Sequence, residues 1–166
     1  GAASVEAYRE EGILPEALVN FLALLGWSPG DDRELMDLPE LIGAFGLDRI
    51  LKKAGVFDPK KLEWLNGKYL AAKDTSELVP LVLDAMSDSD RAIAAEDPAG
   101  FAAIVDLQKT RARTVPGIAE ASMRYLTEPV AYDEAAVRKH WLEDPAATQA
   151  ILAAQRAVLK MAEPFE

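Results

Sequence analysis

The stretch LQKTRARTVPG carries the side chains of this 166-residue chain that are best suited to binding chemistry. It gathers Lys109, Arg111 and Arg113 just before Pro116 and Gly117, where a helix should end. A guanidinium presents two fixed donors to a phosphate or to the edge of an unpaired base, whereas an ammonium acts as a point charge. Basic residues near a helix C-terminus are also favoured by the helix dipole, and from the sequence alone this structural explanation is the stronger one.

A second basic stretch, KKLEWLNGKYL, has the period of a helix that packs on one side. Leu62, Leu65 and Tyr69 share one face, and the lysines are displaced from it. These lysines could offer amines to phosphate, although from the sequence alone a solvated lysine face is the better explanation. The candidates are Lys60, Lys61 and Lys68. Gly67 lies inside the same helix at a cost of about 1 kcal/mol relative to alanine, which indicates close approach of another backbone, either of protein or of RNA. Packing within the protein is the favoured cause.

Other reactive residue types are missing or isolated, so we expect no catalytic residue and no metal ligand in this chain. There is no cysteine, and the single histidine, His140, has no partner that would make it a base or a ligand. The acidic run at 87–90 and the pair at 31–32 lack the ligand set of a calcium loop, and helix capping explains them better. Neighbouring acids such as Glu10 and Glu11 need a cleft to become acid and base catalysts.

The overall charge of −10 argues against attraction of nucleic acid to the whole surface, but the basic residues are clustered. Two local basic surfaces on an acidic body are therefore expected. The hydrophobic fraction of 50% and the charged fraction of 28% are ordinary for a soluble globular protein. The absence of cysteine is compatible with the cytoplasm, and the apolar stretch at 14–25 is too short for a bilayer span, so no membrane partner is expected.

Helix signals recur along the whole chain, and no segment alternates as a strand would. Asp-Pro pairs at 58–59, 97–98 and 144–145 predict helix starts, and Asp74 with Glu77 resembles a capping box. The helix over 14–25 should end with Gly26 in the left-handed conformation and Trp27 as a packing anchor. Further helices are predicted at 4–11, 39–45, 115–125 and 133–141. The chain is therefore predicted to be all-α, with a boundary between two helical subdomains near 73–76.

Two long segments resemble a known family. The segments SVEAYREEGILPEALVNFLALLGWSPGDDREL and FGLDRILKKAGVFDPKKLEWLNGKYL are similar to bacterial glutamyl-tRNA synthetase just after its catalytic KMSKS-type loop. The similarity is specific over residues 4–70 and weakens to a pattern beyond residue 75. No HIGH-type or KMSKS-type signature is present, so the resemblance is to a fragment without the catalytic site.

This resemblance implies an all-α stem-contact subdomain at 1–75 and a first anticodon-binding helical subdomain at 76–166, with the final subdomain of the family absent. It implies binding of tRNA, a partnership with the catalytic domain of the same chain, and a place in the cytoplasm. The fragment itself would hold no cofactor, whereas the parent class I ligase would use ATP and magnesium. By the same resemblance Arg111 would read the third anticodon base, with Arg113 as the alternative register. A helical scaffold for protein interactions without RNA binding remains the rival interpretation.

Overall fold

The structure, a computed structural model, describes residues 4–52, 55–129 and 131–161. All regular elements among these residues are helical, and their one β-type pairing is an isolated antiparallel bridge between Trp27 and Ile50. The all-α prediction is therefore confirmed. Contacts divide the chain into two compact units, residues 1–127 and residues 128–166. The predicted boundary at 75–76 lies inside the first unit, and the separate roles assigned to its two sides stay predictions.

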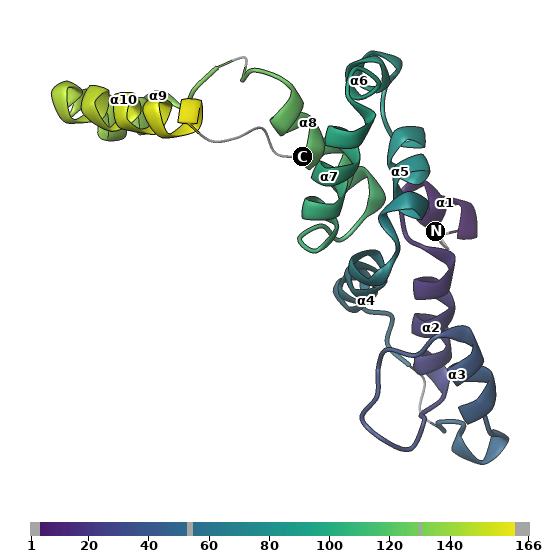
Figure 1. Cartoon of the computed structure of the whole chain (residues 1–166). Helices are drawn as coiled ribbons and strands as arrows, with labels where there is room; N and C mark the ends of the chain where they lie inside the picture. Colours follow the sequence, from purple (N-terminus) through teal and green to yellow (C-terminus); the bar gives the residue numbers. More distant parts are fainter. Residues whose placement is uncertain (1–3, 53–54, 130, 162–166) are drawn as a thin grey trace. The chain divides into compact units, whose positions relative to one another are not determined.

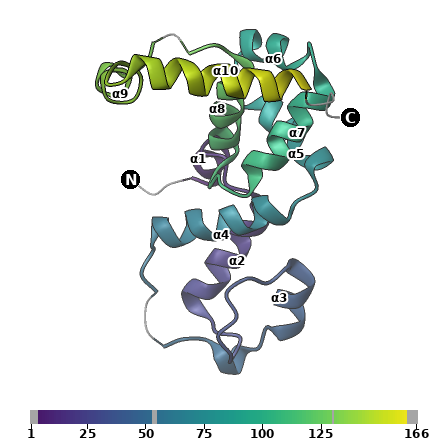
Figure 2. The ribbon, with the colours of Figure 1, turned by 60° about the vertical axis from the view of Figure 1, so that its left-hand side comes forward.

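The first unit contains eight α-helices and one 3₁₀ turn among its described residues (Figure 1). Helix α4 crosses α2, as Figure 2 shows, and α3 lies beside α2. Helices α5, α7 and α8 pack on one another at the other end of the unit. The elements are α1 (Val5–Glu10), α2 (Pro15–Gly26), α3 (Leu38–Ala44), η1 (Leu47–Arg49), α4 (Pro59–Ala72), α5 (Thr75–Asp84), α6 (Asp88–Ala94), α7 (Pro98–Lys109) and α8 (Val115–Leu126).

One apolar core runs through this unit and joins α2 and α4 to α5, α7 and α8. Phe21, Leu65 and Phe101 are among its buried side chains, each from a different helix. A smaller cluster forms around Trp27, which is 3% exposed and packs with Met36. The prediction of Trp27 as a packing anchor is confirmed. Because the main core crosses residue 75, the basic stretch of α4 and that of the α7–α8 turn belong to the same packed body.

Most predicted helix starts are capped as the sequence indicates. The carboxylate of Asp58 accepts from the backbone of Lys60 at 2.9 Å, and the carboxylates of Asp97 and Asp144 cap α7 and α10 in the same way. The capping box predicted at Asp74 is wrong, because the Asp74 side chain caps nothing and Glu77 instead pairs with Lys73 at 3.2 Å. Helix α5 nevertheless begins at the next residue.

The predicted left-handed ending of α2 is also wrong. Gly26 is the last helical residue, and the left-handed glycines among the described residues are Gly12 and Gly30. The chain leaves α2 in an extended conformation at Trp27, with φ −145° and ψ 158°. The Gly26 carbonyl then accepts from the backbone of Leu51 at 2.9 Å, so pairing with a distant segment takes the place of a local turn.

The second unit is described over residues 128–129 and 131–161. It comprises α9 (Glu134–Val137), a π-helical turn η2 (Arg138–Leu142) and α10 (Pro145–Met161). The predicted helix over 133–141 thus begins at the expected place, capped by Asp133, and changes to a π turn after four residues. Tyr132 and Trp141 stack edge to face with ring centroids 4.9 Å apart. No helix formed by the described residues has the length and apolar character required to cross a bilayer.

Candidate nucleic-acid interface

Helix α4 presents its apolar side to the core and its basic side to solvent, as its periodicity predicts. Leu62 and Leu65 are buried, whereas Lys60 and Lys68 are exposed. The Lys68 ammonium lies 5.8 Å from the ring centroid of Trp64, within the range of a cation–π contact. The outer side of α4 therefore combines positive charge with an aromatic surface.

Tyr69 fixes the inner side of α4 through its hydroxyl. This hydroxyl lies 2.6 Å from the Met36 carbonyl and 2.8 Å from Oδ1 of Asn20, and Asn20 also accepts from the backbone of Met36 at 2.9 Å. Burial, followed by the nearby carboxylates of Glu16, Asp37 and Glu40, raises the pKa of Tyr69 to about 12. The phenol is therefore neutral at physiological pH and serves as a structural hydrogen-bonding group.

The predicted arginines lie in the turn between α7 and α8. The backbone amides of Arg111 and Ala112 donate to the Gln108 carbonyl at 2.9 and 3.1 Å, and Thr114 caps α8 by accepting from Gly117 at 3.2 Å. The side chains of Arg111 and Arg113 are exposed. Neither has a hydrogen-bond or ion-pair partner among the described residues, so both guanidinium groups can meet a ligand.

Asn66 of α4 ties this turn to the N-terminal helices. Its side-chain amide donates to the carbonyl of Arg113 at 2.7 Å and to that of Gly12 at 3.1 Å, and its oxygen accepts from Leu14 at 2.8 Å. The residue is fully buried. The backbone of Val115 also donates to Gly12 at 3.2 Å. A single buried side chain thus holds three segments that are far apart in the sequence.

Gly67, the next residue of α4, lies directly under Arg113. A Cβ atom at Gly67 would be 2.6 Å from a guanidinium nitrogen of Arg113 and 3.2 Å from the carbonyl oxygen of Ala112. The prediction that Gly67 permits close packing is therefore confirmed. The contact also brings the two predicted basic stretches together in space.

Lys109 forms the second connection between these stretches, and it uses all its donors in doing so. Its ammonium lies 2.7 Å from the Asp106 carboxylate, 3.1 Å from the Lys73 carbonyl and 3.2 Å from the Thr75 hydroxyl. The hydrogen bond from Lys109, followed by that from Thr75, holds the pKa of Asp106 below its usual value. Only 14% of the Lys109 side chain is exposed, so this predicted contact residue is engaged within the protein.

Two other lysines, one in α4 and one at its C-terminal end, are paired with carboxylates. Lys61 lies 2.5 Å from Glu34, in a pair that is open to solvent. Lys73 lies 2.8 Å from Glu16, and its hydrogen bond to that carboxylate raises the pKa of Lys73. Burial of Glu16 opposes ionisation, but its contacts with Lys73 prevail and lower the pKa of Glu16. Of the predicted residues, Arg111, Arg113, Lys60 and Lys68 are therefore exposed without a carboxylate partner among the described residues.

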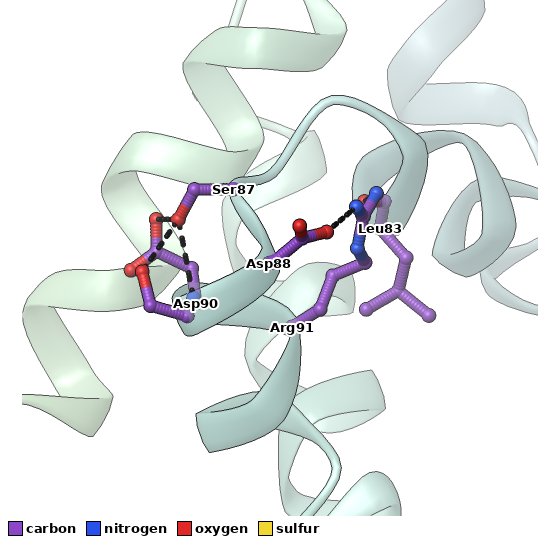
Figure 3. Close-up of polar contacts among 6 residues, drawn as sticks. Leu83, Ser87, Asp88, Asp90 and Arg91 are labelled. Carbon is purple, nitrogen blue, oxygen red and sulfur yellow. Dashed lines mark hydrogen bonds and ion pairs between the residues drawn. The ribbon is translucent and has the colours of Figure 1, made fainter.

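The acidic run at 87–90 has a structural role (Figure 3). The Ser87 hydroxyl accepts from the backbone of Asp90 at 3.2 Å and donates to its carboxylate at 2.8 Å, so it caps α6. Asp88 pairs with Arg91, whose guanidinium also donates to the Leu83 carbonyl at 3.2 Å. This confirms capping as the explanation of the run. Within the described residues, no three His, Cys, Asp or Glu side chains gather as metal ligands would.

Sequence reasoning missed Asn66 and Gly12 as residues that position the turn. A signal for Asn66 was present, because it lies four residues from both Leu62 and Leu70 and so falls on the buried face of α4. A polar residue on such a face needs hydrogen-bond partners. For Gly12 the reason is spatial: its φ is +76°, and a side chain there would collide with Pro116 and Val115. Both of these residues are more than a hundred positions away from Gly12 in the sequence.

Comparisons with known proteins identify both halves of the chain. The family model described as "tRNA synthetases class I (E and Q), catalytic domain" matches residues 2–64, and the model described as "Anticodon binding domain" matches residues 71–166. The chain is 38% identical over 144 residues to a glutamate–tRNA ligase of Desulforudis audaxviator, covering 85% of this chain and 29% of that protein. It is 44% identical over 142 residues to the ligase of Syntrophobacter fumaroxidans, covering 84% and 29%.

A solved structure shows the same fold. The crystal structure of a glutamate tRNA ligase from Elizabethkingia meningosepticum, in complex with its amino acid, is 30% identical, with a TM-score of 0.72. The similarity covers 96% of this chain and 30% of that one. The chain thus spans less than a third of the length of each of these three relatives.

Proposed function

Because the chain belongs to the family of anticodon-binding domains, whose model matches residues 71–166, we propose that it is the tRNA-binding part of a glutamate–tRNA ligase. In this proposal residues 1–75 contact the stem on the inner side of the L-shaped tRNA, and residues 76–166 reach the anticodon. The chain positions tRNA for glutamylation, a step of protein synthesis that takes place in the cytoplasm.

The close packing of α4 against the α7–α8 turn is the observation that best supports this proposal. Asn66 and Gly67 place the exposed Arg111 and Arg113 next to a helix whose outer side carries Lys60 and Lys68. Phosphate contacts fix the position of a nucleic acid, and contacts to base edges supply specificity. An arrangement of lysines beside two free guanidinium groups provides donors for both purposes.

Within this surface we assign the base contact to Arg111 and phosphate contacts to the remaining basic residues. Unpaired bases in an RNA loop expose their hydrogen-bonding edges, and a guanidinium can meet such an edge with two donors. Arg111 is exposed and has no carboxylate partner among the described residues, as a base-reading side chain requires. The phosphate contacts would come from Arg113, Lys60, Lys61 and Lys68, and from Lys109 only after exchange of its present partners.

The catalytic domain of the same protein would be the second partner. Residues 2–64 match a catalytic-domain model, and this part of the chain exposes large apolar side chains on and after α3. Ile42 is 69% exposed and Leu47 is 78% exposed. Apolar side chains grouped in this way are typical of a surface that another part of a protein covers.

The parent ligase would use ATP and magnesium, and we assign both to the remainder of that enzyme. The reason is that this sequence carries no HIGH-type or KMSKS-type signature. The rival interpretation, a scaffold that binds only proteins, is not favoured, because the curated relatives that this chain resembles are glutamate–tRNA ligases.

A direct test measures binding of a fluorescently labelled glutamate tRNA by anisotropy at increasing salt. We expect weak binding that falls steeply with salt, because few phosphates can be neutralised by a body with a net charge of −10. A glutamate tRNA with a changed third anticodon base is the matched control and should bind less tightly. Absence of binding to both RNAs at low salt would contradict the proposed function.

A further inference from the structure

Gly67 occupies a position where backbone geometry does not require glycine. It lies in the middle of α4, a helix of 14 residues, and is not among the glycines with positive φ. Glycine in a helix interior is less favourable than alanine. The space above Gly67 is therefore the feature to explain, and the side chain of Arg113 fills it.

Both parts of Arg113 are held in this position. Its carbonyl accepts the hydrogen bond from the buried Asn66 amide at 2.7 Å, which fixes the backbone. Its Cδ and one guanidinium nitrogen lie 2.9 and 2.6 Å from where a Cβ of Gly67 would be, so the side chain lies across the bare helix backbone. The guanidinium thus begins with less conformational freedom than an exposed arginine normally has.

The neighbouring side chains on α4 make this position suitable for an anion. Trp64 lies one turn before Gly67 and Lys68 directly after it, with the Lys68 ammonium over the Trp64 ring. The nearest carboxylate on the helix, Glu63, forms no ion pair with Arg113 among the described residues. Lys68 and Trp64 thus flank Gly67 along α4, and the Arg113 side chain packs over Gly67 without an ion-pair partner among the described residues.

We propose that Gly67 is a positioning residue, which seats the Arg113 guanidinium beside Lys68 and Trp64 as a binding site for the sugar-phosphate backbone of RNA. This inference rests on the proposed function and extends it. A guanidinium pairs with phosphate through two parallel hydrogen bonds, and fixing it beforehand reduces the entropy lost on binding. The contact carries no base specificity, which separates it from the role assigned to Arg111.

The test compares Gly67→Ala with Gly26→Ala, a matched control in a helix where an added Cβ meets no atom within 4 Å. Binding of two labelled anticodon stem-loop RNAs, which differ only at the third anticodon base, is measured over a range of salt concentrations. Gly67→Ala should weaken binding of both RNAs equally, by about threefold or more, as expected for loss of one hydrogen-bonded contact. It should also reduce the salt slope by about one, as expected for loss of one phosphate contact. Gly26→Ala should bind both RNAs as the unchanged chain does.

Thermal unfolding separates positioning from a structural role. Alanine favours the helix, and the atoms within 3.0 Å of the added Cβ belong to the Arg113 side chain, which can move toward solvent. The Ala112 carbonyl, at 3.2 Å, needs only a small shift, so Gly67→Ala should unfold no lower than Gly26→Ala. Arg113→Ala should weaken binding as Gly67→Ala does, and the double variant should bind no more weakly than Arg113→Ala. If Gly67→Ala instead unfolds early, the double variant should regain that loss, because the clashing atoms are gone.

Several results would overturn the assignment. These are unchanged binding by Gly67→Ala or by Arg113→Ala, unequal loss for the two RNAs, and early unfolding of Gly67→Ala that Arg113→Ala does not relieve. If the unchanged chain binds both RNAs but Gly67→Ala binds them as tightly as the unchanged chain does, the proposed function stands. The role of Gly67 in positioning Arg113 is then wrong. If the unchanged chain binds neither RNA, the proposed function fails and this assignment fails with it.

Discussion

The side-chain amide of Asn66 donates a hydrogen bond of 2.7 Å to the carbonyl of Arg113, across 47 positions of sequence. This bond joins α4 to the turn that carries the candidate base-reading arginine. It is one of three that Asn66 makes, and all three partners are backbone groups. The precision of the proposed RNA surface therefore depends on a residue that does not contact RNA.

Replacing Asn66 with alanine should destabilise the protein strongly. The change leaves the amide of Leu14 without its partner and removes donors from the carbonyls of Gly12 and Arg113. We expect a loss of about 3 kcal/mol in the free energy of unfolding, measured by urea denaturation. Lys60→Ala, on the exposed side of the same helix, is the control and should change stability by less than about 0.5 kcal/mol. Equal stability of the two variants would contradict the role of Asn66.

Replacing Arg111 with glutamine should relax discrimination at the third anticodon base. In the full-length ligase we expect a loss of about 1–3 kcal/mol in discrimination, because glutamine cannot supply the paired donors of a guanidinium. Charging of the correct tRNA should change much less. The measurement compares charging of tRNAs that differ only at this base.

Arg113→Gln is the register control for that experiment. If discrimination falls only in Arg113→Gln, the base contact belongs to Arg113 and the phosphate assignment is wrong. If it falls in neither variant, base recognition lies elsewhere in the protein.

Replacing Lys60, Lys61 and Lys68 together with alanine should flatten the salt dependence of tRNA binding. Each lost phosphate contact reduces the slope by about one. Lys61 should contribute least, because its ammonium already pairs with Glu34. Single variants measured over the same salt range would separate the three. A slope unchanged in the triple variant would exclude the outer side of α4 as the phosphate surface.

The ion pair between Glu16 and Lys73 should make stability depend on pH at the acid end. Since the pKa of folded Glu16 lies below its ordinary value of 4.5, its contribution is complete above that value and is lost as pH falls through the folded pKa. The pair is partly exposed, so the effect should be below about 1 kcal/mol. Urea denaturation of Glu16→Gln should show a weaker pH dependence in this range. An identical dependence in both proteins would show that the pair contributes nothing.

The chain alone should not activate glutamate with ATP. It lacks the nucleotide-binding signatures, and we assign ATP to the remainder of the parent enzyme. ATP–pyrophosphate exchange in the presence of glutamate and tRNA should equal the rate without protein. Exchange above that rate would require a catalytic site within these residues.

Local signals predicted the helices well because their causes are local. Asp58 and Asp97 cap the helices that follow them, and the residue types alone identify such caps. The same logic was wrong at Asp74, whose side chain caps no backbone amide of α5, and Glu77 pairs with Lys73, four residues before it. Competition between partners of similar strength is not visible in a sequence pattern.

The candidate site was predicted as residue types on two separate stretches, but its geometry was not. Nothing in the sequence near Arg113 indicates that it lies over Gly67, because that contact depends on how α4 crosses the packed helices. Lys109 shows the reverse case. Its residue type suggested a free cation, whereas the fold brings Asp106 and the Lys73 carbonyl to its ammonium.

The bonds of Asn66 also constrain the order in which this protein can acquire its structure during synthesis. Leu14 precedes Asn66 by 52 positions, so that bond can form as soon as α4 leaves the ribosome. The acceptor at Arg113 emerges 47 residues later. Until then the nascent helices α1 to α4 carry a polar amide on the face that will be buried, and their core is open where α7 and α8 will close it. The speed of translation between the codons for Asn66 and Arg113 thus sets how long this incomplete core is exposed to aggregation and to chaperones.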